Sequence, residues 1–245
     1  MDSHNGPKNT SVTADDIEIL RYDNRYREQA LEVLRKSFFL HEIVCIGAEV
    51  DRTPQAQTDL EQLCLDVADG GVSLIARHKP TDTIVGVSFN VLQTPSGPDD
   101  NYFEQFRDTK CTTDSSRSLM QYMITMDAKI NLFERFNVKC LLEIMFLATL
   151  PACEGHGIGT RLVEQSVALA QRLRSGAELS ADGGDRRPEL VSALFTSRIS
   201  QRVGEKNGFA VVNQVPHSEF VFRGKTFTER AGPEHPFSTL VVKHL

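Results

Sequence analysis

The chain has 245 residues, of which 40% are hydrophobic and 24% are charged, and its formal net charge is -6. This size suffices for one sizeable core, so we expect a single domain over residues 15–245 behind a flexible segment over residues 1–14. The acidic balance argues against nucleic acid or an anionic membrane surface as the main partner. With neither an apolar signal core nor a membrane-length apolar run, the sequence predicts a cytoplasmic protein.

Cysteine usage points the same way. The five cysteines are an odd number, and no CxxC pair occurs among them. This pattern indicates neither a disulfide framework nor a zinc site, and it fits a reducing compartment. We therefore expect no bound metal, and we expect a monomer.

The first half of the chain predicts strands and helices in mixed order. Apolar alternation indicates a strand at 17–22, and an apolar stripe indicates a helix at about 25–38. A second helix should begin near Thr53, followed by strands at 72–78 and 83–93. The polar, turn-rich segment from residue 94 to residue 116 is expected to be a loop insertion.

The second half is more strongly patterned. Helical spacing of apolar residues predicts one helix over 119–133, and the almost wholly apolar run 141–150 predicts a strand buried on both faces. A further helix, another strand, a short helix ended by Gly208 and two closing strands should follow. The expected fold is mixed α/β, with a central sheet covered by helices on both faces.

Alternating glycines follow the buried strand directly, in the stretch "PACEGHGIGTRL" at 151–162. A Walker-type loop would need a lysine before Thr160, and a dinucleotide fingerprint would need GxGxxG after an early strand. The pattern Arg/Gln-x-x-Gly-x-Gly/Ala of acetyl-CoA-dependent N-acetyltransferases fits, except that Glu154 occupies its first position. Such a loop holds a diphosphate by backbone N–H groups and by the positive end of the next helix. A plain strand-to-helix turn is the alternative.

With the order of elements added, the chain resembles the GNAT superfamily over most of its length, and more closely the insect-type arylalkylamine N-acetyltransferases. Three stretches carry the closer resemblance: "SFFLHEIV" at 37–44, "TSRISQRVGEKNGF" at 196–209 and "PEHPFSTLVVKHL" at 233–245. The resemblance implies a mostly antiparallel, twisted central sheet flanked by helices. It also implies that two central strands splay apart to form the cleft for coenzyme A.

The resemblance also implies how acetyl-CoA is held. The buried strand would pair with the pantetheine arm and offer a backbone N–H to the oxyanion, while the glycine loop would meet the diphosphate. Two cations on the short helix could approach the adenosine phosphates, or they could form a solvated face. The expected cofactor-binding residues are Leu147, Ala148, Thr149, Gly155, His156, Gly157, Ile158, Gly159, Thr160, Arg202 and Lys206.

The implied chemistry is aminolysis of a thioester. An alkylamine with a pKa of about 10 must first lose a proton, and Glu42 is the candidate general base. The family's hydroxyls are matched by Thr196 and Ser200, although Ser200 could instead make a local helix-start hydrogen bond. Many GNAT enzymes place a tyrosine where this chain has Gly204. The expected acceptor pocket comprises Phe38, Phe39, Met123, Met145 and Phe146, although most of these residues could instead belong to the core.

We therefore expect an acetyl-CoA-dependent N-acetyltransferase that acetylates a small primary amine by direct transfer, such as tyramine, dopamine or serotonin. Glu154, Thr196 and Gly204 depart from the family pattern. These departures leave open a coenzyme A-binding module without catalysis. An acetyltransferase that acts on protein or peptide amines is the third alternative.

Overall fold

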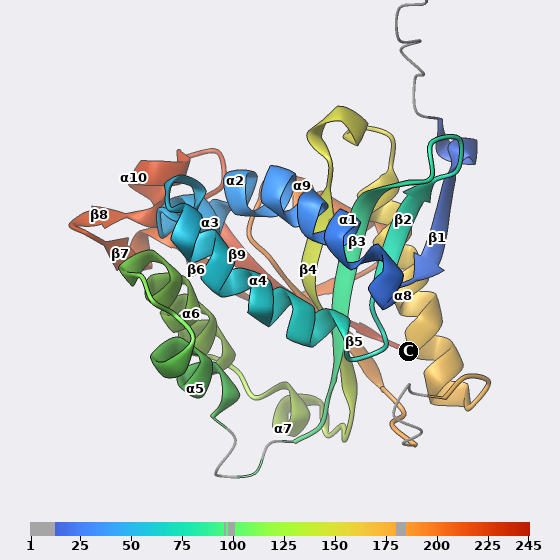
Figure 1. Cartoon of the computed structure of the whole chain (residues 1–245). Helices are drawn as coiled ribbons and strands as arrows, with labels where there is room; N and C mark the ends of the chain where they lie inside the picture. The colour runs from blue at the N-terminus through green and yellow to red at the C-terminus, as the bar shows by residue number, and fades with distance from the viewer. Residues whose placement is uncertain (1–12, 96, 98–100, 180–184) are drawn as a thin grey trace, which may run out of the picture.

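The structure is a computed structural model that describes residues 13–95, 97, 101–179 and 185–245. Most of the expected N-terminal segment 1–14 therefore lies outside the described residues. A seven-stranded sheet in the order β1-β2-β3-β4-β5-β9-β6 crosses the molecule (Figure 1). Its strands are β1 (Ile17–Arg21), β2 (Leu74–His78), β3 (Thr83–Gln93), β4 (Leu141–Thr149), β5 (Leu190–Phe195), β6 (Ala210–Pro216) and β9 (Phe237–His244).

Neighbouring strands of the sheet are antiparallel except β4 and β5, which run parallel. A small ribbon of β7 (Val221–Phe222) and β8 (Lys225–Thr226) stands apart from the sheet. The expected mixed α/β fold with a mostly antiparallel central sheet is confirmed.

Helices cover both faces of the sheet, as the sequence predicts (Figure 1). On one face α1, the π-helical segment η3 and α4 pack on β3 and β4, and on the other face α8 packs across β2, β3 and β4. The helices are α1 (Arg27–Val33), η3 (Leu34–Phe38), α2 (Phe39–His41), α3 (Ile43–Gly47), α4 (Pro54–Ala68), α5 (Tyr102–Thr109), α6 (Asp114–Asp127), α7 (Leu132–Phe136), α8 (Ile158–Ser175), α9 (Arg198–Lys206) and α10 (Phe227–Ala231).

Strand β4 is buried on both faces, as its apolar run predicts. Leu142 and Ile144 belong to the core beneath α8, while Phe146 and Ala148 belong to the core beneath α1 and α4. The change of face between these pairs has a local cause. Strand β3 pairs Phe89 with Phe146 but the next residue, Asn90, with Ile144, so Met145 is an extra residue in β4. Met145 therefore forms a β-bulge, which bends the strand and re-aims its side chains.

The parallel pairing of β4 with β5 ends at the same place. It runs from Leu141 opposite Leu190 to Ile144 opposite Ala193. Strand β4 nevertheless continues to Thr149, and β5 continues to Phe195 along β9. The second half of β4 thus parts from β5 at the bulge, which is the splay expected between the two central strands.

The expected loop insertion over 94–116 contains a helix, so this prediction was wrong for α5. Buried Asp59 on α4 anchors the segment after that helix. Its carboxylate accepts hydrogen bonds from the backbone N–H of Thr112 (2.7 Å) and from the hydroxyl of Ser116 (2.7 Å). Of the aromatic residues of α5, Phe106 is buried and Phe103 is half-buried, whereas Tyr102 is exposed. Turn-forming residues around α5 masked its short amphipathic pattern.

The helix expected over 119–133 is two helices, because α6 ends at Asp127 and α7 begins at Leu132. The side chain of Asn131 accepts a hydrogen bond from the backbone N–H of Glu134 (3.2 Å) and so caps α7. The apolar spacing continues through the break, which explains why spacing alone suggested one helix.

The tight contact between α3 and α10 yields a stability prediction. A Cβ atom on Gly47 would lie 2.3 Å from the ring of Phe227, which is fully buried. We expect Gly47→Ala to lower the free energy of unfolding by about 2 kcal/mol through overpacking. Gly97→Ala, which meets open space, should change it by less than about 0.5 kcal/mol. Urea unfolding midpoints measure both, and equal midpoints for the two variants would contradict the prediction.

Candidate active site

Glu42 occupies a break in the first helical layer. The chain is helical from α1 through η3 to α2, becomes extended at Glu42 (φ -69°, ψ 136°) and is helical again in α3. The Glu42 carboxylate accepts a hydrogen bond from the backbone N–H of Cys45 (2.7 Å), so the side chain caps α3. An acidic cap is favourable at the positive end of a helix. The π-helical turn just before Glu42 is a feature that often marks functional sites.

Thr196 lies just beyond the end of β5 and contacts Glu42. Its hydroxyl donates a hydrogen bond to the second oxygen of the Glu42 carboxylate (Oγ1 to Oε1, 2.6 Å), although 154 positions separate the two residues. Each carboxylate oxygen can accept more than one hydrogen bond. The two donors therefore fix the orientation of Glu42 and leave lone pairs for a further donor.

Ser200 is engaged differently. It forms a capping box with Ser197 at the start of α9, in which the Ser197 hydroxyl accepts from the Ser200 N–H (3.1 Å) and the Ser197 N–H donates to the Ser200 hydroxyl (3.2 Å). The structure thus brings Thr196 to Glu42 and holds Ser200 one turn further along. A catalytic role for Ser200 stays a prediction.

Gly204 has a packing reason to be glycine. A Cβ atom there would lie 2.6 Å from the ring of Phe195 at the end of β5. The close approach of α9 to β5 leaves no room for a larger residue at this position. A tyrosine acting as an acid could not stand here without moving the helix.

The glycine loop adopts the backbone expected of an anion cradle. Gly155 (φ 79°) and Gly157 (φ 74°) lie in the left-handed region, and a Cβ on either would meet open space. Helix α8 begins at Ile158, and Gly157 at its N-cap provides no side chain to occupy the first N–H groups. The imidazole of His156 contacts the carbonyl of Glu154 (2.8 Å). The first N–H groups of α8 are therefore left without a capping side chain, an arrangement that can bind an anion.

The open edge of β4 presents alternate backbone groups. The N–H of Leu150 donates to the carbonyl of Val85 (2.9 Å), and the antiparallel register continues with Gly86 opposite Thr149 and Val87 opposite Ala148. Hydrogen-bonded pairs alternate along such a ladder. The backbone groups of Ala148 therefore face β3, whereas those of Leu147 and Thr149 face the side from which β5 has departed.

The remaining expected cofactor residues are placed around the start of α8. The side chain of Ile158 is buried beneath the loop, so this residue offers its amide alone. Arg202 and Lys206 are exposed on α9, which packs beside α8. Sequence reasoning missed Asn207, whose side-chain amide donates to the carbonyl of Thr160 (3.3 Å) and joins the two helices. Its place before Gly208 suggested only a helix end.

The residues of the expected acceptor pocket differ in how deeply they are buried. Phe39 (1% exposed) and Phe146 (4% exposed) are core residues, the alternative that the sequence left open for them. Their place in a pocket lining stays a prediction. Phe38, Met123 and Met145 are half-buried and pack against that core. The ring of Phe38 stands edge-on to that of Phe146, with centroids 5.4 Å apart. Apolar residues of core and pocket look alike in sequence, which is why the two sets were joined.

Strand β4 carries a carboxylate, Glu143, that sequence reasoning missed. Glu143 lies two residues before the bulge at Met145 and accepts a hydrogen bond from the side chain of Gln93. Burial and the neighbouring Asp127 carboxylate raise the pKa of Glu143 to about 7. The surrounding apolar run gave no sign that this carboxylate would be half-buried.

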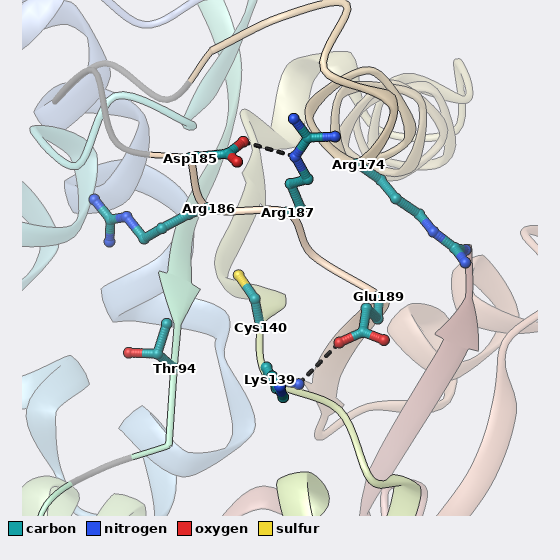
Figure 2. A pocket seen from close by; sticks show the side chains of 8 residues that line it. All are labelled: Thr94, Lys139, Cys140, Arg174, Asp185, Arg186, Arg187 and Glu189. Atoms are coloured by element: carbon teal, nitrogen blue, oxygen red, sulfur yellow. Dashed lines mark hydrogen bonds and ion pairs between the residues drawn. The ribbon is translucent and has the colours of Figure 1, made fainter.

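A cavity of about 440 Å³ lies away from Glu42, at the beginning of β4 and β5. Figure 2 shows its lining, where Arg187 pairs with Asp185 and the carboxylate of Glu189 accepts from the backbone of Lys139. Because β4 and β5 are parallel, this cavity opens at the opposite edge of the sheet from the glycine loop. It is separate from the site built around Glu42.

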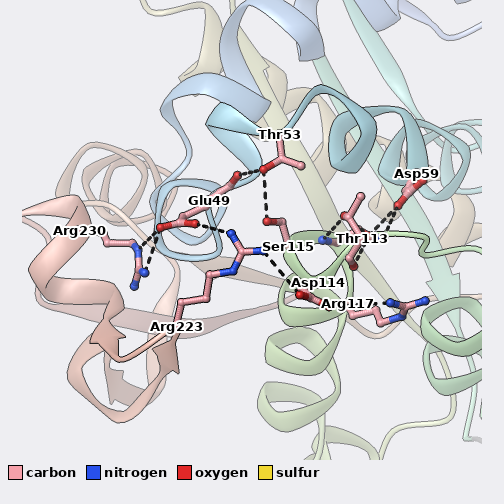
Figure 3. A network of polar contacts seen from close by, with 10 residues as sticks. Glu49, Thr53, Asp59, Thr113, Asp114, Ser115, Arg117, Arg223 and Arg230 are labelled. Atoms are coloured by element: carbon pink, nitrogen blue, oxygen red, sulfur yellow. Dashed lines mark hydrogen bonds and ion pairs between the residues drawn. The ribbon is translucent and has the colours of Figure 1, made fainter.

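A charged cluster holds the segment that carries Glu42 (Figure 3). Glu49 adopts a left-handed backbone (φ 58°), and its carboxylate pairs with Arg230 (3.0 Å) and Arg223 (3.1 Å). Arg223 also pairs with Asp114 at the start of α6 (3.5 Å). The Arg230 side chain is 6% exposed, so removing its partner would leave a buried charge. The cluster ties α3, α6 and α10 together.

Comparison with known proteins bears on the fold. No protein-family model and no curated protein sequence matches the chain. Arylalkylamine N-acetyltransferase 2 from Aedes aegypti superposes with a TM-score of 0.77 at 22% identity, over 94% of this chain and 99% of that chain. The chain has the GNAT fold. A polyamine N-acetyltransferase from Drosophila melanogaster (TM-score 0.73, 20% identity, 94% and 100% coverage) and an agmatine N-acetyltransferase mutant (TM-score 0.74, 20% identity, 94% and 100% coverage) agree.

In the described part of the chain, membrane-spanning helices and metal-binding clusters are both absent. None of its helices combines the length and the apolarity needed to cross a bilayer. Within the same residues, His, Cys, Asp and Glu side chains form no group of three or more suited to a metal ion.

The raised pKa of Glu143 yields a stability prediction. The folded protein binds this proton more tightly than the unfolded chain, whose carboxyl has its ordinary pKa of 4.5. Stability therefore falls as pH rises from about 4.5 to about 7. Relative to wild type, Glu143→Gln should become more stable as pH increases from 5 to 8, measured by guanidinium unfolding. Exposed Glu164→Gln is the control, and parallel curves for all three proteins would contradict the prediction.

Proposed function

We propose that this protein is an acetyl-CoA-dependent N-acetyltransferase that acetylates a small primary amine of the arylalkylamine class. The observation that carries the proposal is the 2.6 Å hydrogen bond between Thr196 and Glu42. These residues were selected from separate stretches of sequence, and they meet beside the point where β4 and β5 part. The shared fold with arylalkylamine and agmatine N-acetyltransferases supports the same reaction class.

The residues present fit acetyl-CoA. The amides from Gly155 to Thr160 would bind the diphosphate, because left-handed Gly155 and Gly157 bring the backbone N–H groups outward without side chains. Leu147 and Thr149 would pair with the pantetheine arm as an added strand. Arg202 and Lys206, exposed on α9, would approach the adenosine phosphates. Acetyl-CoA supplies the acetyl thioester as a co-substrate.

Glu42 performs the proton transfer in this proposal. The protonated amine gives one proton to a free lone pair of the Glu42 carboxylate, whose orientation Thr196 and the N–H of Cys45 maintain. The neutral amine nitrogen then forms a bond to the acetyl carbon, and the carbon–sulfur bond breaks. The nitrogen passes its remaining extra proton to the departing thiolate, so that the products are the amide and the thiol of coenzyme A. A backbone N–H beside the bulge at Met145 would stabilise the oxyanion. The leaving thiolate comes from a thiol with a pKa of about 8.5 and needs little help from an acid. The presence of Gly204, in place of a tyrosine that could act as an acid, is compatible with this step.

Transfer is direct in this mechanism. Cys153, the cysteine beside the glycine loop, is buried, and burial raises the pKa of its thiol. A thiol held protonated is a poor nucleophile. An acyl-cysteine intermediate is therefore not part of the proposal.

The half-buried side chains that pack against the core on this side support the acceptor class. Phe38, Met123 and Met145 provide an aromatic ring and two flexible thioethers. Thioethers adapt to aromatic rings of different shape. Phenylethylamine and indolylethylamine acceptors combine such a ring with the primary amine that Glu42 would deprotonate.

The Glu42→Gln variant tests the function. Removing the base should lower kcat by about 10² to 10⁴-fold, while the Kd for coenzyme A stays unchanged because the loop is untouched. Free-thiol release with acetyl-CoA and a panel of arylalkylamines, agmatine and short peptides measures turnover, and Glu164→Gln is the matched control. Wild type as inactive as Glu42→Gln would indicate a binding module. Peptides that outcompete small amines would indicate a protein acetyltransferase.

Glu154→Arg tests the diphosphate site. Glu154 is exposed at the entrance of the loop, so its charge opposes a bound diphosphate. We expect the substitution to lower the Kd for coenzyme A about threefold to tenfold, an effect that should shrink with added salt. Isothermal titration calorimetry measures it, with exposed Glu134→Arg on α7 as the charge-matched control. An unchanged or weaker affinity in Glu154→Arg would contradict the proposed orientation of the loop.

A further inference from the structure

Three polar side chains form a buried chain close to Glu42. They are Tyr122 on α6 (4% exposed), His217 in the short turn η6 (His217–Glu219; 0% exposed) and Ser238 on β9 (0% exposed). The Tyr122 hydroxyl contacts the Ser238 hydroxyl, and Ser238 Oγ lies 2.7 Å from His217 Nε2. His217 Nδ1 lies 2.7 Å from the carbonyl oxygen of His235. Burying such groups costs free energy unless they are hydrogen-bonded, as these are.

The donors and acceptors in this row of side chains can be assigned in only one order. The His235 carbonyl can only accept, so Nδ1 of His217 carries the hydrogen. Burial lowers the pKa of His217, which favours the neutral ring, and Nε2 then accepts from the Ser238 hydroxyl. Ser238 in turn accepts from Tyr122, whose pKa burial raises, so that the phenol keeps its hydrogen. Every donor in the chain therefore has one assigned acceptor.

The chain reaches the proposed active site at its far end. His217 holds the turn before β9 twice, because its backbone N–H also donates to the carbonyl of Pro236 (2.9 Å). The imidazole of His235 accepts from the backbone N–H of Arg198 (3.2 Å) in the first turn of α9. Arg198 stands two residues after Thr196. Hydrogen bonds, bridged by the covalent structure of His235, thus link α6 to the turn just after Thr196.

The path is unsuited to proton transport. It ends on the carbonyl oxygen of His235, which has no hydrogen to pass on and is not basic. The negative charge of Glu42 nevertheless acts to raise the pKa of both Tyr122 and His217, although burial is the larger influence on each. These hydrogen-bonded side chains therefore do not carry a proton to or from Glu42. They can instead act by fixing the positions of the residues around Glu42.

We propose that His217 is a positioning residue for acetyl transfer. Through the Nδ1 bond to the His235 carbonyl, it fixes the His235 turn and the start of α9, and so keeps the Thr196 hydroxyl on the Glu42 carboxylate. Ser238 and Tyr122 satisfy the second ring nitrogen, which would otherwise be buried without a partner. The inference rests on the proposed function for its kinetic consequence. Its structural consequence, an ordered first turn of α9, is independent of any reaction.

Two amide substitutions separate the bonds that His217 makes. His217→Asn places an N–H where Nδ1 was, so it keeps the bond to His235 and loses the one to Ser238. His217→Gln places its amide where Nε2 was, so it keeps the bond to Ser238 and loses the one to His235. Both variants retain a polar, neutral side chain, and urea unfolding midpoints verify that both fold.

Steady-state kinetics with acetyl-CoA and the best arylalkylamine then distinguish the variants. We expect His217→Asn to keep kcat within threefold of wild type and His217→Gln to lose at least tenfold in kcat, with the KM for acetyl-CoA within twofold in both. Equal losses in the two variants, or a His217→Gln kcat within threefold of wild type, would overturn the proposal.

Amide hydrogen exchange in the protein without substrates provides the second readout. The N–H groups of Ser200 and Gln201, in the first turn of α9, should exchange at least tenfold faster in His217→Gln than in His217→Asn. Equal exchange rates would overturn the proposal even if no amine is turned over. Absence of turnover in wild type would instead contradict the proposed function alone.

Discussion

The parting of β4 from β5 after Ile144 is the constraint on which the proposed site depends. Unpaired N–H and C=O groups in the middle of a sheet cost free energy unless something satisfies them. The bulge at Met145 produces this edge by inserting one residue opposite β3, so the strand keeps its partner on one side and loses it on the other. Leu147 and Thr149 are left facing the gap. A ligand that pairs as an added strand satisfies such an edge.

The other parts of the site collect around that gap because β4 and β5 are parallel. Their carboxyl ends meet at one edge of the sheet, where ligands of α/β proteins commonly bind. The glycine loop and the start of α8 follow β4, and Thr196 and the start of α9 follow β5. Glu42 arrives from the helical layer, at a break between α2 and α3. Each piece has a local cause, such as a cap or a left-handed glycine, and the strand topology brings the pieces together.

Two polar networks fix the segments that carry Glu42 and Thr196. The cluster around Glu49 ties α3 to α6 and α10 through paired charges, one of which is nearly buried. The buried chain through His217 ties α6 to the start of α9. Helix α6 takes part in both networks and also carries Met123. Because buried polar groups tolerate little misalignment, the two networks restrict how far α6 can move relative to Glu42 and α9.

Features set by short stretches of sequence were predictable from the sequence by itself. They are the buried strand, expected over 141–150 and found over Leu141–Thr149, the glycine loop before α8 and the helix end at Gly208. The tertiary structure decided what depends on distant contacts. It placed Thr196 on Glu42, engaged Ser200 in a cap, turned the chain at Met145, and separated buried Phe39 from half-buried Phe38. Apolar periodicity cannot tell core from pocket, because both bury the same side chains. Nothing in the sequence singled out His217, because its partners Tyr122 and Ser238 come from distant segments that only the fold brings together.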